Sequence, residues 1–304
     1  MKSMPDLTVI ILTYNEEKHI ERALRSVKKI ADVIWVVDSF STDNTLHIAE
    51  DMGAQTVKNV FTNHAAQFAW ALENCNISTT WVMRLDADEY LTENLVLEIK
   101  TRLHMLKESI TGIVLKRQVH FMGKWIRFGG YYPVKLLRIW RTGAATMEQR
   151  WMDEHVVLSH GETVTFDHDF VDDNLNSLTW WTMKHNDYAT REAIDLLNKK
   201  YGFYVNDDRL IQSGSSQQII NKRWYKDNVY GKMPLFLRSL FYFLYRYFIK
   251  LGFLDGKKGL IWHFLQGFWY RFLVDSKIYQ MEYLAFSEKK SIKDIIEEKF
   301  NFKI

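Results

Sequence analysis

The chain has 304 residues, 47% hydrophobic and 25% charged, which is typical of a globular protein with one large domain or two medium ones. Its formal net charge of +3 is too small for the dense basic surface that nucleic-acid binding needs, so nucleic acid is excluded as a partner. A single cysteine, Cys75, excludes an intrachain disulfide and fits a reducing, intracellular compartment. The apolar run Leu7 to Leu12 is too short for the core of a signal peptide.

The first part of the chain alternates strands with helices. The expected strands are Leu7 to Thr13, Val33 to Val37, Thr56 to Val60 and Trp81 to Leu85, and the expected helices are Glu17 to Lys28, a segment ending near Gly53, and Ala65 to Cys75. Alternation of this kind implies right-handed crossovers and a parallel sheet. The sequence therefore predicts an α/β fold with a mostly parallel central sheet.

The pattern changes after a further helix through Leu95 to Leu106. Short strands are expected at Gly112 to Lys116, Val134 to Trp140, Val156 to Leu158 and Thr163 to Phe166. They lie among glycine, aromatic and charged loop residues, so we expect antiparallel additions to the sheet.

Two aromatic segments fill residues 235 to 284, separated by Asp255 to Lys258. Neither is predicted to span a membrane, because a charge at the centre of a span costs about 2.5 to 3.5 kcal/mol and three basic residues interrupt the first segment. Arg238, Arg246 and Lys250 fall on one side of a helix, which suits a helix lying in a bilayer interface, with Arg271 adding to the attraction for anionic lipid. The alternatives are a helical extension packed on the catalytic core, or a dimer interface.

Three carboxylates follow the fourth expected strand: Asp86, Asp88 and Glu89. Strand ends in an open α/β sheet line the ligand crevice, and two carboxylates that share a rim repel unless a cation sits between them. Mg²⁺ or Mn²⁺ prefers oxygen ligands and often keeps a substrate phosphate in its shell. The stretch therefore predicts a metal-bound, phosphorylated substrate, with a solvated loop and helix cap as the alternative.

Three strand ends together resemble those of the family 2 glycosyltransferases of the GT-A fold. They are Thr13-Tyr14-Asn15-Glu16, the segment Asp38 to Asp43, and Asp86-Ala87-Asp88-Glu89. The resemblance implies that Thr13, Tyr14 and Glu16 contact the base and ribose of a nucleotide-sugar donor, UDP-linked in our expectation, and that Asp38 contacts the base edge. A carboxylate can accept the imide N–H of uracil, and a tyrosine can stack on the ring.

The same resemblance assigns Asp86 to the ribose or a metal-bound water and Asp88 to a metal that bridges the diphosphate. It places His168 where some relatives supply a third metal ligand. Many relatives carry Arg or Lys where this chain has His64 and Gln67, so neutralisation of the diphosphate is expected to rest more heavily on the metal. The segment Lys184 to Arg191 resembles one that borders the donor site in lipopolysaccharide and exopolysaccharide enzymes.

The general base is expected in Trp151-Met152-Asp153-Glu154-His155, where relatives show an acidic residue before a hydrophobic strand. Glu154 fits slightly better than Asp153, and the choice between them stays open. The C-terminal segments resemble those of enzymes that act on lipid-linked saccharides at the cytoplasmic face of the bacterial inner membrane.

These features predict a catalytic domain over residues 1–230 and a helical, aromatic extension over residues 231–304 that packs or associates with membrane. The leading hypothesis is a metal-dependent, inverting hexosyltransferase, cytoplasmic and peripheral on the inner face of the plasma membrane. Its acceptor would be a lipid-linked or lipopolysaccharide-type saccharide. One rival is a nucleotidyltransferase or nucleotide-sugar hydrolase, although Thr13 to Lys18 lacks the glycine that cradles a triphosphate. The other is a non-catalytic membrane scaffold. The oligomeric state stays open.

Overall fold

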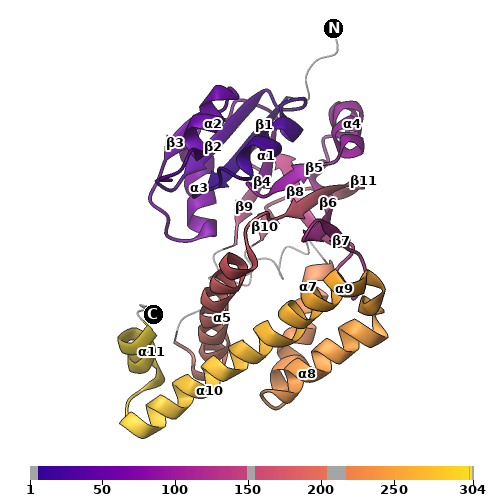
Figure 1. Ribbon diagram of the computed structural model, residues 1–304. Helices are drawn as coiled ribbons and strands as arrows, with labels where there is room; N and C mark the ends of the chain where they lie inside the picture. The colour runs from indigo at the N-terminus through magenta and orange to yellow at the C-terminus, as the bar shows by residue number, and fades with distance from the viewer. Residues whose placement is uncertain (1–5, 149–154, 204–216, 301, 303–304) are drawn as a thin grey trace.

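A computed structural model describes residues 6–148, 155–203, 217–300 and 302 of the chain. Four parallel strands begin the central sheet, in the order β3-β2-β1-β4 (Figure 1). These are β1 (Leu7–Thr13), β2 (Val33–Asp38), β3 (Gln55–Lys58) and β4 (Trp81–Asp86), connected by helices α1 (Ile20–Val27), α2 (Thr45–Asp51) and α3 (His64–Asn74). The expected α/β fold with a parallel sheet is confirmed in this half.

The sheet continues past β4 with strands from residues 89–173, in the order β4-β8-β6-β11-β5, and β7 pairs with β6. The elements are β5 (Glu89–Leu91), α4 (Glu93–Arg102), a 3₁₀ turn at Leu103–Met105, β6 (Ile110–Phe121), β7 (Lys124–Ile126), β8 (Val134–Arg141) and β11 (Glu162–Asp173). Strand β8 is antiparallel to both β4 and β6, as expected.

Two expectations about this half need correction. Strands β6 and β11 are far longer than the expected strands at 112–116 and 163–166, and they pair in parallel. Strand β10 (Val156–Leu158) does not join the central sheet but pairs with β9 (Ala145–Met147) in a separate ribbon. Short apolar runs mark where strands lie, but pairing depends on partners that are distant in sequence.

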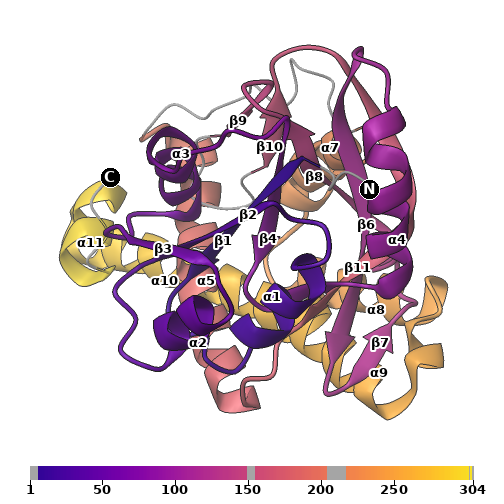
Figure 2. The ribbon, with the colours of Figure 1, turned by 90° about the horizontal axis from the view of Figure 1, so that it is seen from above.

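Each face of the sheet is covered. On one face, β1 and β4 pack against α1, α2 and α4 through residues such as Ile11, Leu24 and Leu95. On the other, Ile10 and Val82 pack against α3 and the β9–β10 ribbon. Figure 2, seen from above, shows α4 and α3 at opposite sides of the sheet. Because both faces are buried, the sequences of the N-terminal strands are nearly continuous apolar runs.

The described residues from 178 onward are mainly helical, and we call the described part of residues 178–300 the helical extension. It contains α5 (Leu178–Tyr201), α7 (Gln217–Asn228), a 3₁₀ turn at Tyr230–Lys232, α8 (Leu237–Leu244), a π-helical turn (Tyr245–Ile249), a 3₁₀ turn (Gly252–Asp255), α9 (Gly256–Trp262), a π-helical segment (His263–Trp269), α10 (Tyr270–Glu288) and α11 (Ile292–Phe300). Helix α5 packs on α10 and α11 through Ala193, Leu197 and Val274, among others. It thus shares a core with helices beyond the predicted boundary at 230. No helix among the described residues is long and apolar enough to cross a membrane.

The loop between β7 and β8 attaches the helical extension to the sheet. Asp255 accepts hydrogen bonds from the backbone N–H groups of Arg127 and Phe128, at 3.2 and 3.0 Å. Gly129 has φ +68°, and a Cβ there would lie 2.1 Å from Cε1 of the buried His263. The loop and the helix therefore fit closely only because residue 129 lacks a side chain.

Four basic side chains of this region were expected to face lipid: Arg238, Arg246, Lys250 and Arg271. The expectation is wrong for the three arginines. Arg238 is buried and forms an ion pair with the buried Asp275. Arg271 pairs with Glu192. Arg246 donates a 2.6 Å hydrogen bond to the carbonyl of Gly129 and lies over the ring of Tyr131. Lys250 is exposed.

Candidate functional site

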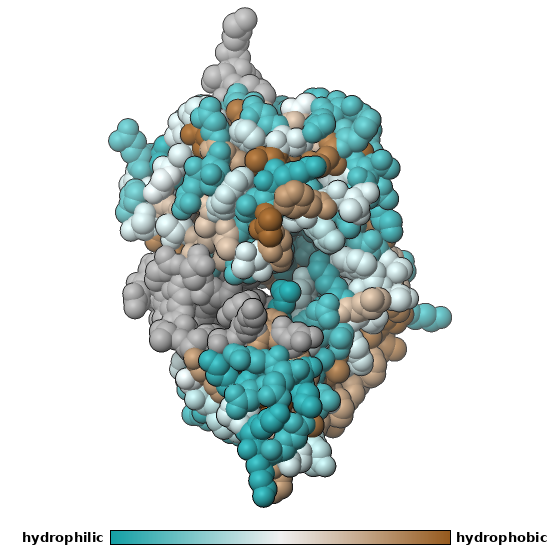
Figure 3. All heavy atoms as spheres, turned by 90° about the vertical axis from the view of Figure 1, so that its left-hand side faces the viewer, coloured by the Kyte–Doolittle hydropathy of each residue, from teal (hydrophilic) through white to brown (hydrophobic). Residues whose placement is uncertain are grey.

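The register of the parallel strands brings the three predicted motifs to one edge of the sheet. Thr13 is paired with Asp38 across β1 and β2, and Leu12 is paired with Asp86 across β1 and β4. We call this edge, residues 13–16, 38–43 and 86–89, the rim. In Figure 3 the molecule is hollowed at mid-height between the sheet part above and the helical part below, with hydrophilic side chains around the hollow.

Asp38 is fully buried at the end of β2 and binds its own loop. Its Oδ1 accepts the hydroxyl of Thr13 at 2.9 Å, and its Oδ2 accepts the N–H of Ser41 at 2.7 Å. Both carboxylate oxygens therefore hold the rim loops in place through internal hydrogen bonds. Contacts of Thr13 and Asp38 with a nucleoside stay a prediction.

Two aromatic rings project from the rim loops. Tyr14 is 60% exposed and Phe40 is 52% exposed. The loops are tied together through Asn15, whose N–H donates to Ser41 Oγ at 2.8 Å and whose Oδ1 accepts the N–H of Thr42 at 2.8 Å. Asn15 and Phe40 both have positive φ, of 55° and 62°, a conformation that such residues adopt mainly where surrounding contacts impose it. The rim thus presents two rings suited to stacking on a base, and the sequence identified only Tyr14.

Glu16 connects the first loop to the end of β11. Its Oε2 lies 2.6 Å from Nδ1 of the buried His19, whose Nε2 accepts the N–H of Leu175 at 2.8 Å. In this structure Glu16 is a positioning group, and the predicted contact with base or ribose is not tested by it.

Asp86 lies between two arginines. Burial opposes its ionisation, but Arg84 and Arg138 outweigh burial and hold the pKa of Asp86 well below its usual range. Arg138 Nη2 also donates to Glu89 Oε1 at 2.5 Å, and the N–H of Asp86 donates to Glu89 Oε2 at 3.0 Å. Burial raises the pKa of Glu89 to about 8, against the attraction of Arg138. Arg138 was missed, although an arginine between the apolar pairs Leu136-Leu137 and Ile139-Trp140 was a usable signal.

Asp88 is partly exposed, and the end of β11 holds it. Its Oδ2 accepts the side-chain N–H of Asn174 at 3.0 Å, and its carbonyl accepts the N–H of Asp173 at 3.1 Å. Asp172 lies opposite Glu89 in the β5–β11 pairing. Burial, with the charges of Asp88 and Asp86, raises the pKa of Asp172 to about 6. The sequence analysis did not identify Asp172 or Asn174 as site residues.

The structure does not bring His168 to the two aspartates. His168 Nδ1 lies 2.9 Å from Glu98 Oε2 on α4, and its N–H donates to the same oxygen at 3.0 Å. It precedes Asp172 by four residues on β11, a separation of about 13 Å along a strand. Among the described residues, no group of three His, Cys, Asp or Glu side chains could hold a metal ion.

The rim carboxylates nevertheless fit a metal that a substrate helps to bind. Mg²⁺ is commonly held by one or two carboxylates together with substrate phosphates and water, and does not need a cage made only of protein. Asp88, partly exposed with its charge beside Asp86 and Asp172, is a donor of this kind.

Helix α5 brings positive charge to the rim. Burial works against protonation of Lys184, but Tyr188, Asp88 and Glu16 outweigh burial and raise its pKa. Its Nζ lies 4.6 Å from the centroid of the Trp180 ring. Burial lowers the pKa of His64 to about 4, and the charges of Arg84, Lys184 and Arg191 act in the same direction. Helix α5 thus carries two basic residues, Lys184 and Arg191, whose charges act on the first residue of α3.

The two candidates for the general base, Asp153 and Glu154, lie outside the described residues. The segment that contains them is flanked by Glu148 and His155, which are joined by a 2.9 Å hydrogen bond from the N–H of Glu148 to the carbonyl of His155.

Comparison with known proteins gives one family and several relatives. The sequence model described as "Glycosyl transferase family 2" matches residues 8–174. A protein of Rickettsia typhi named as an uncharacterised glycosyltransferase, RT0209, is 27% identical over 270 residues, covering 85% of this chain and 82% of its own length. The lipopolysaccharide core biosynthesis glycosyltransferase LpsC of Rhizobium meliloti is 26% identical over 288 residues, covering 90% and 92%.

Among solved structures, glucosyl-3-phosphoglycerate synthase of Mycobacterium tuberculosis, in complex with Mn²⁺, uridine diphosphate and glucosyl-3-phosphoglycerate, is 23% identical. The match covers 38% of this chain and 44% of that one, with a TM-score of 0.31. A similarity of this extent carries no argument about the present chain.

Proposed function

Because the chain belongs to glycosyl transferase family 2, we propose that it transfers a hexose from a UDP-sugar to a hydroxyl of a lipid-linked or lipopolysaccharide-type saccharide, with inversion. The main support is one piece of geometry: the parallel register brings Asp86 and Asp88 to the same strand ends as the exposed rings of Tyr14 and Phe40. Lys184 on α5 is a cation that the charges of Asp88 and Glu16 favour. A nucleoside diphosphate needs an aromatic surface for its base and balanced charge for its phosphates, and this rim offers both. The likeness to LpsC along most of both chains supports the saccharide acceptor.

The donor would bind with its base against Tyr14 and Phe40 and its diphosphate between Asp88 and Lys184. A Mg²⁺ or Mn²⁺ ion held by Asp88, with Asp86 beside it, would neutralise the charge that builds on the departing nucleoside diphosphate. Lys184, whose pKa is raised by Tyr188, Asp88 and Glu16 against the effect of burial, would contribute to the same neutralisation from the side of α5. Arg138 and Glu89 keep the Asp86 backbone in place.

Inversion requires a single displacement. The acceptor oxygen forms a bond to the anomeric carbon while the bond from that carbon to the diphosphate oxygen breaks, and a base takes the acceptor proton. Glu154 is our first candidate for this base and Asp153 the second.

We also propose that the protein is peripheral on the inner face of the plasma membrane and binds through the turn between α8 and α9 (Figure 1). Residues 248–254 form this apolar turn, in which the large hydrophobic side chains are exposed: Phe248, Ile249, Leu251, Phe253 and Leu254. Lys250 and Lys257 are exposed there as well. Apolar side chains edged by lysines suit the boundary between headgroups and acyl chains. This turn replaces the buried arginines as the predicted contact.

A thermal-shift screen of nucleotide sugars with and without Mn²⁺ tests the proposal, because a ligand that binds the native state raises its melting temperature. We expect UDP-sugars to stabilise the protein more than other nucleotide sugars, and Mn²⁺ to enlarge the shift. Hydrolysis of a bound donor would exclude the scaffold. Stabilisation by nucleoside triphosphates alone would favour the nucleotidyltransferase and overturn the proposal.

A further inference from the structure

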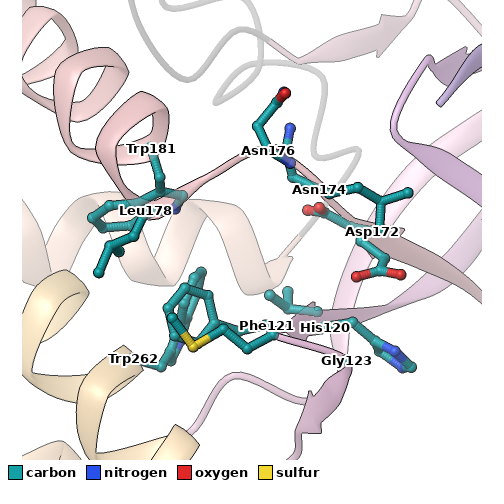
Figure 4. Close-up of a pocket in the computed structure, with 13 residues that line it drawn as sticks. His120, Phe121, Gly123, Asp172, Asn174, Asn176, Leu178, Trp181 and Trp262 are labelled. Atoms are coloured by element: carbon teal, nitrogen blue, oxygen red, sulfur yellow. The ribbon is translucent and has the colours of Figure 1, made fainter. Parts of the chain in front are cut away.

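A cavity of about 300 Å³ lies beside Asp88 but outside the rim (Figure 4). It is enclosed by the end of β6 and the turn into β7, the segment that follows β11, the first turn of α5, and Trp262 of α9. Its size is at the lower end of pockets that hold small ligands, which run from about 300 to 1,000 Å³.

The sheet order places this cavity across the carboxylates from the proposed nucleoside position. Strands β1 and β2, which carry Tyr14 and Asp38, lie on one side of β4, and β6 and β11 lie on the other. Pairing of β11 with β5 sets Asp172 beside Glu89, and pairing with β6 sets Asp173 beside His120. A ligand in the cavity would therefore approach the diphosphate position from the side opposite the base.

One wall of the cavity is aromatic. Phe121, Trp181 and Trp262 form it, with ring centroids 5.2 Å apart for Phe121 and Trp262 and 6.1 Å apart for the two tryptophans. Figure 4 shows these rings and Leu178 grouped on one side of the opening. The three side chains are buried, so the wall offers a small, rigid apolar surface on which part of the C–H face of a ring can stack.

The facing wall is polar and held in place. Asp172 lies 3.3 Å from Nη1 of Arg117 through its Oδ2. Asn174 donates to Asp88, and its Oδ1 accepts the N–H of Asn176 at 3.0 Å. Figure 4 shows Asp172, Asn174 and Asn176 across the opening from the aromatic group, with His120 at its lower edge. A carboxylate, two amides and an imidazole can pair with hydroxyl groups as donors and acceptors.

We infer that this cavity binds a sugar ring of the acceptor, stacked on the aromatic wall with its hydroxyl groups toward Asp172, Asn174 and Asn176. The inference rests on the proposed function and extends it, because it gives the acceptor a place and a chemical class of contact. Asn174 connects the two ligand positions, since it lines the cavity and holds the carboxylate of Asp88. The ring is thereby directed at the leaving group instead of at solvent.

Two substitutions on one helix test the inference. Leu178 lines the cavity and Met183 does not, and both are exposed on α5. Leu178→Trp should block the opening, while Met183→Trp adds the same bulk elsewhere. Asn176→Ala is a second cavity variant that removes hydrogen bonding without adding bulk. The probe is an oligosaccharide released from bacterial lipopolysaccharide by mild acid, observed by saturation-transfer NMR in the presence of UDP and Mn²⁺, and UDP binding is measured separately by calorimetry.

We expect Leu178→Trp to weaken oligosaccharide binding at least about tenfold, Asn176→Ala to weaken it less, and Met183→Trp to leave it unchanged. UDP affinity should be the same in all four proteins. If Leu178→Trp binds the oligosaccharide as the wild type does, or if the wild type binds UDP but no oligosaccharide, the cavity assignment is wrong and the donor function stands. If the wild type binds neither UDP nor any nucleotide sugar, the proposed function is wrong and the cavity assignment is wrong with it.

Discussion

The rim and the helical extension both place charged groups next to aromatic rings, but they use the charges differently. At the rim, Asp86 and Asp88 stand at the strand ends beside partly exposed loop residues, where a ligand can reach them. In the extension, Arg238 and Arg271 form ion pairs with carboxylates of the extension itself. The exposed surface around residues 248–254 is largely apolar. A charged residue in an aromatic helix therefore does not by itself indicate what the helix faces. What the charged side chain faces depends on its ion-pair partner, which for Arg238 is Asp275, 37 residues further along the chain.

The largest expected effect is on the buried pair in the extension. Arg238→Met leaves the buried Asp275 without its partner and should lower the free energy of unfolding by about 3–5 kcal/mol. Lys250→Met, at an exposed position nearby, is the control and should change it little. Urea unfolding measures both, and Arg238→Met/Asp275→Leu should recover most of the loss. Wild-type stability for Arg238→Met would contradict the internal role of this arginine.

The attachment of the extension to the sheet should depend on pH through His263. Burial, aided by the charge of Arg246, lowers the pKa of His263 to about 4, below the value near 6.5 expected in the unfolded chain. The unfolded state binds the proton more tightly, so the contribution is complete above about pH 6.5 and is lost as the pH falls towards 4. It amounts to at most about 3 kcal/mol. Melting temperatures from pH 7 to 5 should fall less steeply for His263→Leu than for the wild type, and parallel curves would contradict this.

The difference between the two regions also explains what could be read from sequence. Asp38, Asp86 and Asp88 were found because each ends or follows an apolar run, and parallel register brings strand ends together without further information. Asp172 and Asn174 were missed because they reach the rim through β11, whose pairing with β5 and β6 is long-range. The same strand carries His168 away to Glu98. The helices at 235–284 were recognised from composition, but the burial of Arg238 depends on a specific distant carboxylate.

A third test concerns the proposed general base. Glu154→Gln should lower turnover by roughly 10², the usual scale for losing a general base, while donor affinity stays nearly unchanged. Asp153→Asn serves as the matched control. If Asp153→Asn is the inactive variant the two roles are exchanged, and if both variants stay active the base lies elsewhere.

The smallest expected effect per side chain is on membrane binding. Replacing Phe248 and Ile249 with Ser should weaken binding to anionic vesicles by about 1 kcal/mol or more for each, because partly inserted apolar area is lost. Phe286→Ser, at an 86% exposed site on α10, is the control away from this turn. Flotation with liposomes measures the difference. Equal flotation of all variants would mean that the apolar turn does not contact the bilayer, and no flotation of the wild type at low salt would remove the membrane proposal.

Metal-dependent donor binding at Asp88 tests the function most directly. Calorimetry of UDP-sugar binding, with and without Mn²⁺, should show that the metal strengthens binding to the wild type. The enhancement should disappear in Asp88→Ala, together with transfer activity. Asp167→Ala removes an exposed carboxylate of β11 that pairs with Arg102, and should behave as the wild type does. If Asp88→Ala keeps the metal enhancement, or turns over normally with a chelator present, Asp88 is not the metal ligand of a nucleotide-sugar site and the proposed mechanism is wrong.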